Sequence, residues 1–415
     1  MTTLSPDTLL INAQPGERRF AWLRDGQLVD VEIWREGQGP EAGAVYLGRV
    51  QRIDRRLGAA FVEVGSGTAG FLPLRGTEAS TLSEGRYLPV RVVRAATPQD
   101  GKGPKLSTRL GELSGHPAVE RAISQGRDGA KPGLLSAGDN PIAGDDPVAA
   151  VLRHQGCQVL CDDEDLYHAC RQAAFDAPSD QADGLTFYTE AEPLFEAFGV
   201  EAQIEALLGP QVDLPSGGGL LIEPTRTLTA IDVNAGQHRE PGGPEALAAA
   251  VNREAVPAIA RHLRLRGLSG LIVVDFLRLA AEDQRRTIVS QLRKALRHDP
   301  AASEVRAMSP TGLVEMSRQR RRPPLLEILT IPCGLGGSGR KYSSESNGFA
   351  LLRQLRGQLA HTPGKGFRIK ASRAIIEALE SGQVAAARRQ LETRLGRRLP
   401  MEASRDREEP EIIFS

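Results

Sequence analysis

The stretch Thr229-Ala-Ile-Asp232-Val-Asn234 and the later stretch Leu271-Ile-Val-Val-Asp275-Phe276 decide the fold of this 415-residue chain. Each is a short apolar segment that ends in an acid, a pattern typical of a β-strand. Asp232 and Asn234 are two residues apart, so their side chains lie on the same face of an extended chain. The continuous apolar run before Asp275 indicates a strand that is buried on both sides.

The segment between these strands, Glu245 to Leu265, has the period of an amphipathic helix. Its apolar residues recur about four positions apart, at Leu247, Val251, Ala255, Ile259 and Leu263. A strand, a helix and a strand predict a right-handed crossover with parallel neighbours. Both acids then emerge at the carboxyl edge of one sheet, where open α/β sheets build their sites. Two carboxylates beside an amide suit Mg²⁺. The alternative is that each Asp caps the helix after its strand.

The charge of the chain is balanced overall but unevenly distributed. The 52 basic residues equal the 52 acidic ones, and 40% of residues are hydrophobic, as in an ordinary globular protein of two or three domains. Residues 145–213 contain 15 acidic and 2 basic residues, whereas residues 261–322 contain 14 basic and 6 acidic residues. The basic stretch surrounds Asp275, where a phosphate backbone would need neutralising. Global neutrality therefore does not argue against a polyanionic ligand.

The cysteines and the apolar runs indicate the cellular class. The spacing of the four cysteines, Cys157, Cys161, Cys170 and Cys333, matches no zinc pattern well, so we expect reduced thiols. No apolar run approaches the roughly 20 residues that span a bilayer. The start of the chain lacks the basic and apolar regions of a signal peptide. We expect a soluble, cytoplasmic protein without membrane contact.

Residues 43–110 read as a small barrel. About five short strands broken by glycines, with no long helix, are typical of this architecture. Phe61 and Phe71 lie on successive strands, and Lys102 follows near the end of the barrel. Aromatic rings and lysines on a small barrel fit base stacking and phosphate contact in an OB-fold. The alternative is that both phenylalanines belong to the core.

The rest of the chain supplies helices, strands and links. We expect an amphipathic helix at 192–208, a helix at 282–297, strands at 304–309 and 312–317, and tail helices at 348–360 and 382–396. Residues 111–150 read as irregular. Ser317-Arg-Gln-Arg-Arg-Arg322 is strongly basic; it is either a nucleic-acid contact or a solvated loop. Pro332 to Gly339 is a glycine-rich hinge that lacks the lysine of a Walker motif.

With these elements in place, the chain resembles the ribonuclease E/G family. Similar phrases recur in order along most of its length. They include Tyr46-Leu-Gly-Arg-Val50, Gly70-Phe-Leu-Pro73, Leu228-Thr-Ala-Ile-Asp-Val-Asn234, Gly270-Leu-Ile-Val-Val-Asp-Phe276 and Gly312-Leu-Val-Glu-Met-Ser-Arg-Gln-Arg320. Two acid-bearing motifs at this separation, with an arginine-rich sequel, are highly specific.

The resemblance implies a function for particular residues. Asp232 and Asp275 match the catalytic pair that binds Mg²⁺, and Asn234 matches the amide beside them. Phe61, Phe71 and Lys102 match the RNA-binding residues of the barrel, and Arg318 and Arg320 of the basic sequel are further candidates for RNA contact. The implied reaction is hydrolysis of single-stranded RNA to 5′-phosphate and 3′-hydroxyl ends, in RNA processing or decay. Single-stranded RNA is the implied partner. The sequence is also compatible with a homodimer.

The resemblance also implies a fold class, α/β in several domains of the α+β kind. An RNase H-like half would comprise residues 1–42 and 151–219, with an OB-fold barrel inserted at 43–110. Residues 111–150 would be a linker or reduced sensor region, 220–330 a DNase I-like catalytic subdomain, 331–345 a glycine-rich link and 346–415 a small C-terminal domain.

Three departures from the family pattern leave a second function open. The zinc-binding Cys-Pro-x-Cys link of the family retains only Cys333, so we expect no structural zinc. The strand that senses a 5′-monophosphate is not recognisable within 111–150. Pro310-Thr311 replaces a basic and an aromatic residue before Gly312. The alternative function is therefore an RNA-binding protein with weak or lost catalysis, and phosphodiester chemistry alone would also allow a DNA nuclease.

Overall fold

The chain is divided into two compact units. The computed structural model describes residues 6–36, 43–65, 69–74, 82–94, 103–110, 132–136, 157–176, 184–225, 227–236, 243–332, 339–361, 366–404 and 410–414. One unit comprises residues 1–4, 40–135 and 203–325, and the other comprises residues 5–39, 136–202 and 326–415. Among the described residues, no helix combines the length and the apolar character needed to cross a membrane.

The first unit contains a six-stranded sheet in the order β12-β13-β14-β15-β17-β16. Its strands are β12 (Gln211–Asp213), β13 (Gly219–Pro224), β14 (Thr229–Asn234), β15 (Gly270–Asp275), β16 (Ser303–Val305) and β17 (Leu313–Arg318). β14 and β15 are parallel, and every other neighbouring pair is antiparallel. The predicted crossover is confirmed, because helix α7 (Pro244–Leu265) connects the two parallel strands.

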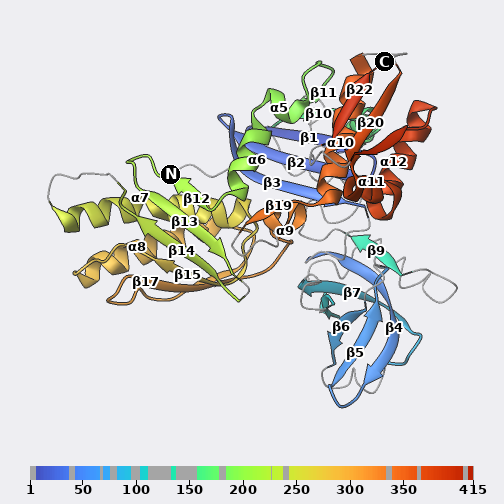
Figure 1. Cartoon of the computed structure of the whole chain (residues 1–415). Coiled ribbons are helices and arrows are strands. Elements are labelled where there is room, and N and C mark those ends of the chain that lie inside the picture. Colours follow the sequence, from blue (N-terminus) through green and yellow to red (C-terminus); the bar gives the residue numbers. More distant parts are fainter. Residues whose placement is uncertain are drawn as a thin grey trace. The chain divides into compact units, whose positions relative to one another are not determined.

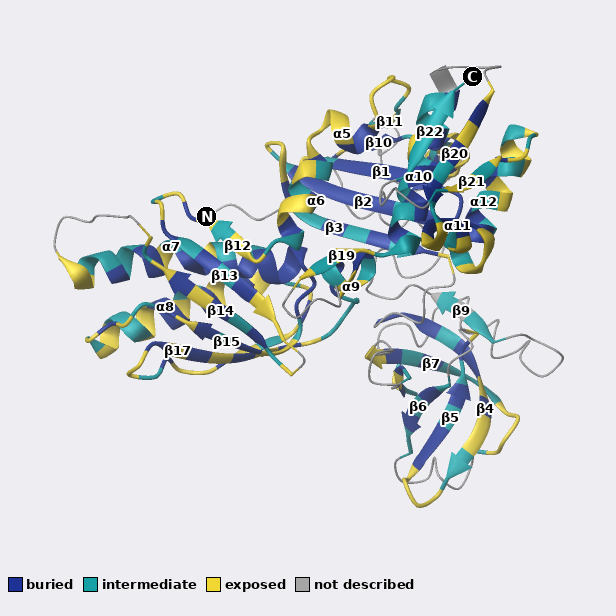
Figure 2. Cartoon of the chain, in the orientation of Figure 1, coloured by how far each residue is buried: buried dark blue, intermediate teal, exposed yellow. Residues whose placement is uncertain are grey.

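Helices α7 and α8 (Glu282–Ala295) cover one face of this sheet (Figure 1). The apolar stripe of α7 is fully buried at Val251, Ala255, Ile259 and Leu263, as its spacing predicts. These residues pack against inward-facing strand residues such as Ile231 and Val274. Burial of each large aliphatic side chain contributes about 1.5–3 kcal/mol, so this layer holds the crossover in place. Buried and exposed residues alternate along β14 toward the end of the strand (Figure 2).

A closed five-stranded barrel also belongs to the first unit. Its strands are β4 (Val45–Asp54), β5 (Ala59–Glu63), β6 (Gly70–Pro73), β7 (Tyr87–Arg94) and β8 (Lys105–Ser107). They follow the order β4-β5-β6-β8-β7 and return to β4. Gly48 and Gly70 permit close packing inside, since an added Cβ would lie 2.4 Å from Val62 and 2.5 Å from Leu106.

One strand lies where the sequence predicted irregular chain. Gly133–Ser136 forms β9, which pairs with β4. Gly65 allows the close approach of this segment, because a Cβ there would lie 2.7 Å from the carbonyl oxygen of Pro132. The interpretation of 111–150 as irregular is therefore wrong at β9, and its other residues, apart from Pro132, lie outside the described part of the chain.

The second unit is built on a five-stranded sheet in the order β11-β10-β1-β2-β3. Its strands are β1 (Thr8–Gln14), β2 (Glu17–Arg24), β3 (Gln27–Arg35), β10 (Gln158–Cys161) and β11 (Leu185–Phe187), with helix α4 (Glu164–Asp176) after β10. β1, β2 and β3 are antiparallel neighbours, whereas β10 and β11 run parallel to β1. The single helix predicted at 192–208 is wrong: Gly199, with φ of 64°, separates α5 (Leu194–Ala197) from α6 (Val200–Leu208).

The C-terminal part of this unit packs three helices on a three-stranded sheet. The helices are α10 (Ser344–His361), α11 (Arg373–Glu380) and α12 (Gly382–Leu395), and the strands are β20 (Phe367–Ser372), β21 (Met401–Ser404) and β22 (Glu411–Phe414). Helix α9 (Leu325–Leu329) and the hairpin β18 (Thr330–Pro332) and β19 (Arg340–Tyr342) precede them. The sequence predicted the helices α10 and α12 but not α11, although the buried Ile375, Ile376 and Leu379 of α11 share one side.

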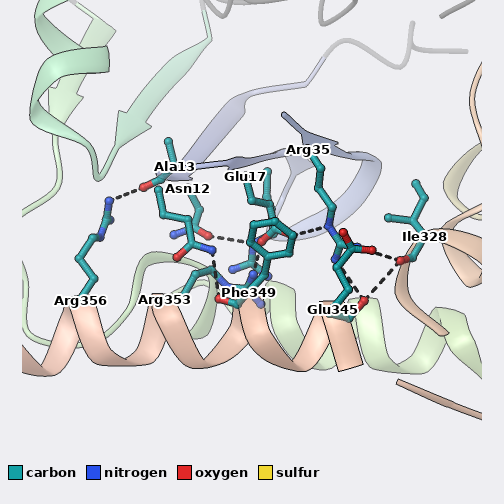
Figure 3. A network of polar contacts seen from close by, with 12 residues as sticks. Asn12, Ala13, Glu17, Arg35, Ile328, Glu345, Phe349, Arg353 and Arg356 are labelled. Atoms are coloured by element: carbon teal, nitrogen blue, oxygen red, sulfur yellow. Dashed lines mark hydrogen bonds and ion pairs between the residues drawn. The ribbon is translucent and has the colours of Figure 1, made fainter. Parts of the chain in front are cut away.

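A buried polar network joins β1, β2 and β3 to α10 (Figure 3). Glu17 is 1% exposed and forms ion pairs with Arg35, at 2.9 Å, and with Arg353 of α10. Burial alone would raise the pKa of Glu17, but Arg353, Arg35 and Arg19 outweigh it and hold the pKa below the ordinary 4.5. Glu17 therefore stays ionised inside the fold, and the network fixes α10 against the sheet.

Candidate active site

The two strand-end acids lie side by side. Asp232 and Asp275 are register partners at the ends of the parallel strands β14 and β15. Neighbouring strands are about 4.8 Å apart, and register partners project to the same face of a sheet. Both side chains are exposed on the face opposite α7 and α8. Neither acid forms an ion pair with a residue that the structure describes. The carboxylates therefore keep their charge available to an external cation.

Asn234 lies on the same face as the acids, as the two-residue spacing predicts. Its Nδ2 donates a hydrogen bond to Oδ2 of Asp232 at 2.8 Å. This bond restricts the rotation of the Asp232 carboxylate and leaves the amide oxygen of Asn234 as a further acceptor.

Two residues whose roles were not predicted from the sequence, Asn252 and Gly312, hold the backbone that follows Asp275. Asn252 of α7 is 0% exposed, donates to the carbonyl of Leu277 at 2.8 Å and accepts from its N–H at 3.0 Å. In the sequence, the signal for this role is an asparagine that falls among the apolar positions of the helix. Gly312 has φ of +104°, and an added Cβ would lie 2.4 Å from the carbonyl oxygen of Phe276.

The loop before β17 is held by its own hydroxyl groups. Oγ of Ser309 lies 2.7 Å from Oγ1 of Thr311 and accepts a hydrogen bond from the N–H of Leu313 at 3.1 Å. Leu313 is 40% exposed and is the register partner of Asp275 on β17. Leu271 is 47% exposed on the same sheet face. Leu313 thus places an apolar side chain beside Asp275, where it can contact a base.

The donor set fits Mg²⁺ rather than a soft metal. Mg²⁺ is usually held by one or two carboxylates, with water and substrate phosphates completing the shell. Asp232 and Asp275 supply two carboxylates, and Asn234 supplies a neutral oxygen. Within the described ranges there is no cluster of three or more His, Cys, Asp or Glu side chains that could hold an ion by itself.

The two arginines predicted to bind RNA differ in their surroundings. Arg318 is 7% exposed and forms two hydrogen bonds of 2.8 Å to Asp299 and one to the carbonyl of Leu268. These contacts stabilise this part of the sheet. They occupy the guanidinium of Arg318 inside the first unit. The period of β17 was the signal, since Val314, Met316 and Arg318 share the buried side. Arg320 is half-buried, and its side chain forms no hydrogen bond or ion pair with a described residue.

On the barrel, Phe61 and Phe71 face outward as register partners of β5 and β6. Both are half-buried, and their rings meet edge to face with centroids 6.1 Å apart. The barrel core is formed by their neighbours, among them Ala60, Val62 and Leu72. Lys102 lies outside the described residues.

The remaining titratable groups of note are buried. Burial raises the pKa of the Cys157 thiol to about 11 and that of Cys161 further, so neither is a thiolate nucleophile at neutral pH. Burial, with the nearby Arg266 and Arg261, lowers the pKa of His262 to about 3. Its Nδ1 accepts a hydrogen bond from Nε of Arg266 at 3.2 Å, as a neutral imidazole can. Cys333 lies outside the described residues.

Comparison with known proteins shows which sequences this chain resembles. The model of the ribonuclease E/G family matches residues 119–321, a range that contains both acids. Ribonuclease E of Escherichia coli K12 is 28% identical over 90% of this chain and 44% of its own length. Ribonuclease G of the same strain is 27% identical over 90% of this chain and 92% of its own length. Ribonuclease E of Haemophilus influenzae is 29% identical over 84% of this chain and 45% of its own length.

The chain thus spans less than half of the ribonuclease E proteins and most of ribonuclease G. The matched range holds Asp232, Asn234 and Asp275 on the strands that bring them together. In sequence over the range that carries both acids, the chain is similar to the ribonuclease E/G family.

Proposed function

We propose that this protein is a Mg²⁺-dependent endoribonuclease that hydrolyses single-stranded RNA and leaves 5′-phosphate and 3′-hydroxyl ends. The observation that carries this proposal is the register pairing of Asp232 with Asp275. The two carboxylates are exposed on adjacent parallel strands, and neither has an ion-pair partner among the described residues. Their negative charge therefore has no evident role in stabilising the fold. The names ribonuclease E and ribonuclease G of its relatives support the same reaction class.

Asp232 and Asp275 would hold the ion through their carboxylate oxygens. A bound Mg²⁺ polarises the phosphoryl oxygen and lowers the pKa of a coordinated water. Asn234 orients Asp232 through its 2.8 Å hydrogen bond, and its amide oxygen can accept a hydrogen bond from a water or a ribose hydroxyl. Asn252 and Gly312 keep the backbone beyond Asp275 in one position. Histidine, cysteine and serine nucleophiles are not needed in this scheme.

The barrel would bind the RNA strand next to the scissile bond. We interpret it as an OB-fold, because numbering its strands from one to five gives the closed order 1-2-3-5-4 with strands three and five parallel. Phe61 and Phe71 face outward, where rings can stack on bases. We interpret the sheet of the second unit as RNase H-like and the six-stranded sheet as DNase I-like.

A cleavage assay tests the proposal. The purified chain is incubated with end-labelled single-stranded RNA in Mg²⁺ or in EDTA, using matched 5′-phosphate and 5′-hydroxyl substrates. We expect internal cleavage in Mg²⁺ only, with product ends that a ligase accepts as 5′-phosphate and a poly(A) polymerase extends as 3′-hydroxyl. Asp283→Asn, an exposed acid of α8, is the matched control for substitutions of the candidate acids.

The result distinguishes an endoribonuclease from an RNA-binding protein without catalysis. Tight RNA binding without cleavage in Mg²⁺ or Mn²⁺ would establish an RNA-binding protein that has lost catalysis. Cleavage of single-stranded DNA at an equal rate would refute RNA as the preferred substrate. Cleavage that persists in EDTA would refute the metal assignment.

A further inference from the structure

The segment that follows Asp275 carries an exposed arginine, Arg278. The two residues are three positions apart, so at most about 11 Å of backbone separates them. Phe276 and Leu279 are buried in the core, and Leu277 packs against it. Within 276–279, Arg278 is the exposed residue. Its side chain therefore leaves the core at the carboxyl end of β15, close to the acid pair Asp232 and Asp275.

Side chains of α7 and α8 fix the backbone on both sides of Arg278. Asn252 of α7 is 0% exposed and bonds both the N–H and the carbonyl of Leu277. Glu245 of α7 accepts a hydrogen bond at 3.1 Å from the N–H two residues after Arg278. Arg285 of α8 donates to the next two carbonyl groups after Arg278, at 2.7 Å each. Arg278 thus stands on a backbone segment that is held in one position relative to the sheet.

The guanidinium of Arg278 forms no hydrogen bond or ion pair with a residue that the structure describes. Other arginines of the first unit have partners: Arg306 pairs with Glu304 at 3.1 Å, and Arg318 with Asp299 at 2.8 Å. Arg278 does not pair even with the acid pair nearby. The fold therefore fixes the backbone at Arg278 without using its charge internally.

The charge balance at the acid pair calls for a further cation. Two carboxylates cancel the charge of one Mg²⁺, so the three together offer a phosphodiester little net attraction. Negative charge develops on the phosphoryl oxygens when water adds to phosphorus, and positioned donors stabilise such charge. A guanidinium suits this task, because its paired N–H donors match two oxygens of a phosphate.

We propose that Arg278 binds the nonbridging oxygens of the scissile phosphate and stabilises the charge that develops on them. This rests on the proposed function, because it takes hydrolysis of RNA as the reaction. A water oxygen bonds to phosphorus, the bond from phosphorus to the 3′ oxygen breaks, and the 3′ oxygen takes up a proton. Arg278 donates hydrogen bonds throughout and transfers no proton.

Metal affinity tests the position of Arg278. Mn²⁺, which accepts the same oxygen ligands as Mg²⁺ and is visible by EPR, is titrated into the full chain at about 10 mM salt. Coulomb's law in water makes the repulsion between a guanidinium and a divalent ion about 8 Å away worth about fourfold in affinity at this salt. We expect Arg278→Gln to tighten Mn²⁺ binding by about that factor.

Arg297→Gln is the matched control for Arg278→Gln. Arg297 is exposed just beyond the far end of α8, which is about 21 Å long, and forms no hydrogen bond or ion pair with a described residue. Its substitution should leave Mn²⁺ affinity within about 1.5-fold of wild type, because the charge is distant from the acid pair.

Cleavage and RNA binding test the role of Arg278. With saturating RNA and Mg²⁺ in single turnover, Arg278→Gln should slow cleavage about 100- to 1,000-fold, as expected for one donor to a developing oxyanion. RNA affinity in EDTA should change less than about threefold. Arg278→Lys should recover about tenfold in rate, because it restores the charge without the paired donors. Arg297→Gln should cleave at the wild-type rate.

Each contrary result has a distinct meaning. If wild type cleaves and Arg278→Gln cleaves within threefold of it, the role of Arg278 is overturned and the proposed function stands. A loss of rate that an equal loss of RNA affinity explains would reduce Arg278 to general attraction of RNA, which also overturns the inference. Slower cleavage with unchanged Mn²⁺ affinity would place Arg278 away from the acid pair and overturn the contact. Absence of cleavage by the wild-type chain would overturn the proposed function and this inference together.

Discussion

Glu17 and the pair Asp232 and Asp275 are acids in opposite circumstances. Glu17 is 1% exposed and faces Arg35 and Arg353, with Arg19 near enough to lower its pKa further. Asp232 and Asp275 are exposed at the carboxyl ends of two central strands, and no arginine or lysine among the described residues pairs with them. The first acid is neutralised inside the protein, whereas the second two carry unbalanced charge outward.

The difference separates an acid that is paired inside the fold from two acids that we propose to bind a ligand. A buried carboxylate without its cations would cost several kcal/mol, so Glu17 and its arginines depend on one another. Exposed carboxylates at register distance repel one another weakly in water and gain only when a cation arrives. Substitutions in the two regions should therefore affect different quantities, stability in one and catalysis in the other.

The largest effect is expected at the acid pair. Asp232→Asn or Asp275→Asn should lower the cleavage rate at least a thousandfold, about 4 kcal/mol of barrier, because each removes an anionic ligand but keeps the shape. The free energy of unfolding should change by less than about 0.5 kcal/mol, as is usual for exposed sites. Single-turnover cleavage and urea denaturation measure the two quantities. A rate within tenfold of wild type would remove these residues from the mechanism.

Glu17→Leu should show the reverse pattern. It removes the acid paired with Arg353 and leaves Arg35 with Glu345, which lies 3.9 Å away and is 44% exposed, so unfolding of the second unit should become about 3–5 kcal/mol easier. Cleavage per folded molecule should stay close to wild type. Asp165→Asn is the control, because Asp165 also pairs with an arginine, at 3.0 Å, but its side chain is 82% exposed. A loss below about 1 kcal/mol for Glu17→Leu would show that the network is not structural.

The two units should also respond to acid in different pH ranges. His262, whose pKa is lowered to about 3, stabilises the first unit fully above the ordinary pKa of 6.5, and this stability is lost as pH falls from 6.5 toward 3. The loss should reach on the order of 3 kcal/mol at pH 4. Glu17, whose pKa is below 4.5, stabilises the second unit above 4.5, and that contribution decreases only at lower pH.

Hydrogen exchange followed in each unit across pH 3 to 7 measures this difference. His262→Gln should remove most of the dependence between pH 6.5 and 4 in the first unit, because glutamine does not titrate. The second unit should be unaffected by the same substitution. Equal loss of stability in both units above pH 4.5 would contradict the assignment of His262.

The smallest effect is expected at Asn252. Asn252→Ala removes both hydrogen bonds to Leu277, so the backbone beyond Asp275 becomes less well positioned. We expect kcat to fall about tenfold, roughly 1.4 kcal/mol, with KM for RNA unchanged. Asn252→Asp, which keeps one acceptor, should recover part of the rate. A fall in stability with kcat intact would limit Asn252 to a structural role.

Local patterns were sufficient to predict the two strands that carry Asp232 and Asp275. The acids, the apolar run before Asp275 and the four-residue period of α7 are short-range features, and all three are confirmed by the register of β14 and β15. The break at Gly199 was not predicted, because a single glycine inside an apolar period is often tolerated within a helix.

Long-range charge pairing was beyond these patterns. Arg318 reads as one member of a basic stretch, and only the fold reveals that Asp299 neutralises it. Glu17 and Arg353 are separated by 336 residues, so no local period connects them. The strand β2, which carries Glu17, alternates charged and apolar residues too irregularly to be distinguished from its neighbours by sequence.

The same separation orders events during synthesis. The five barrel strands lie between Val45 and Ser107, so the barrel can close early on the ribosome. Strand β1 must wait for β10 at Gln158–Cys161, and Glu17 for Arg353 of α10. At about 5–20 residues per second, the acid that α10 later covers remains unpaired with Arg353 for about 17–67 s. The sheet of the second unit is thus the first to be started and among the last to be completed.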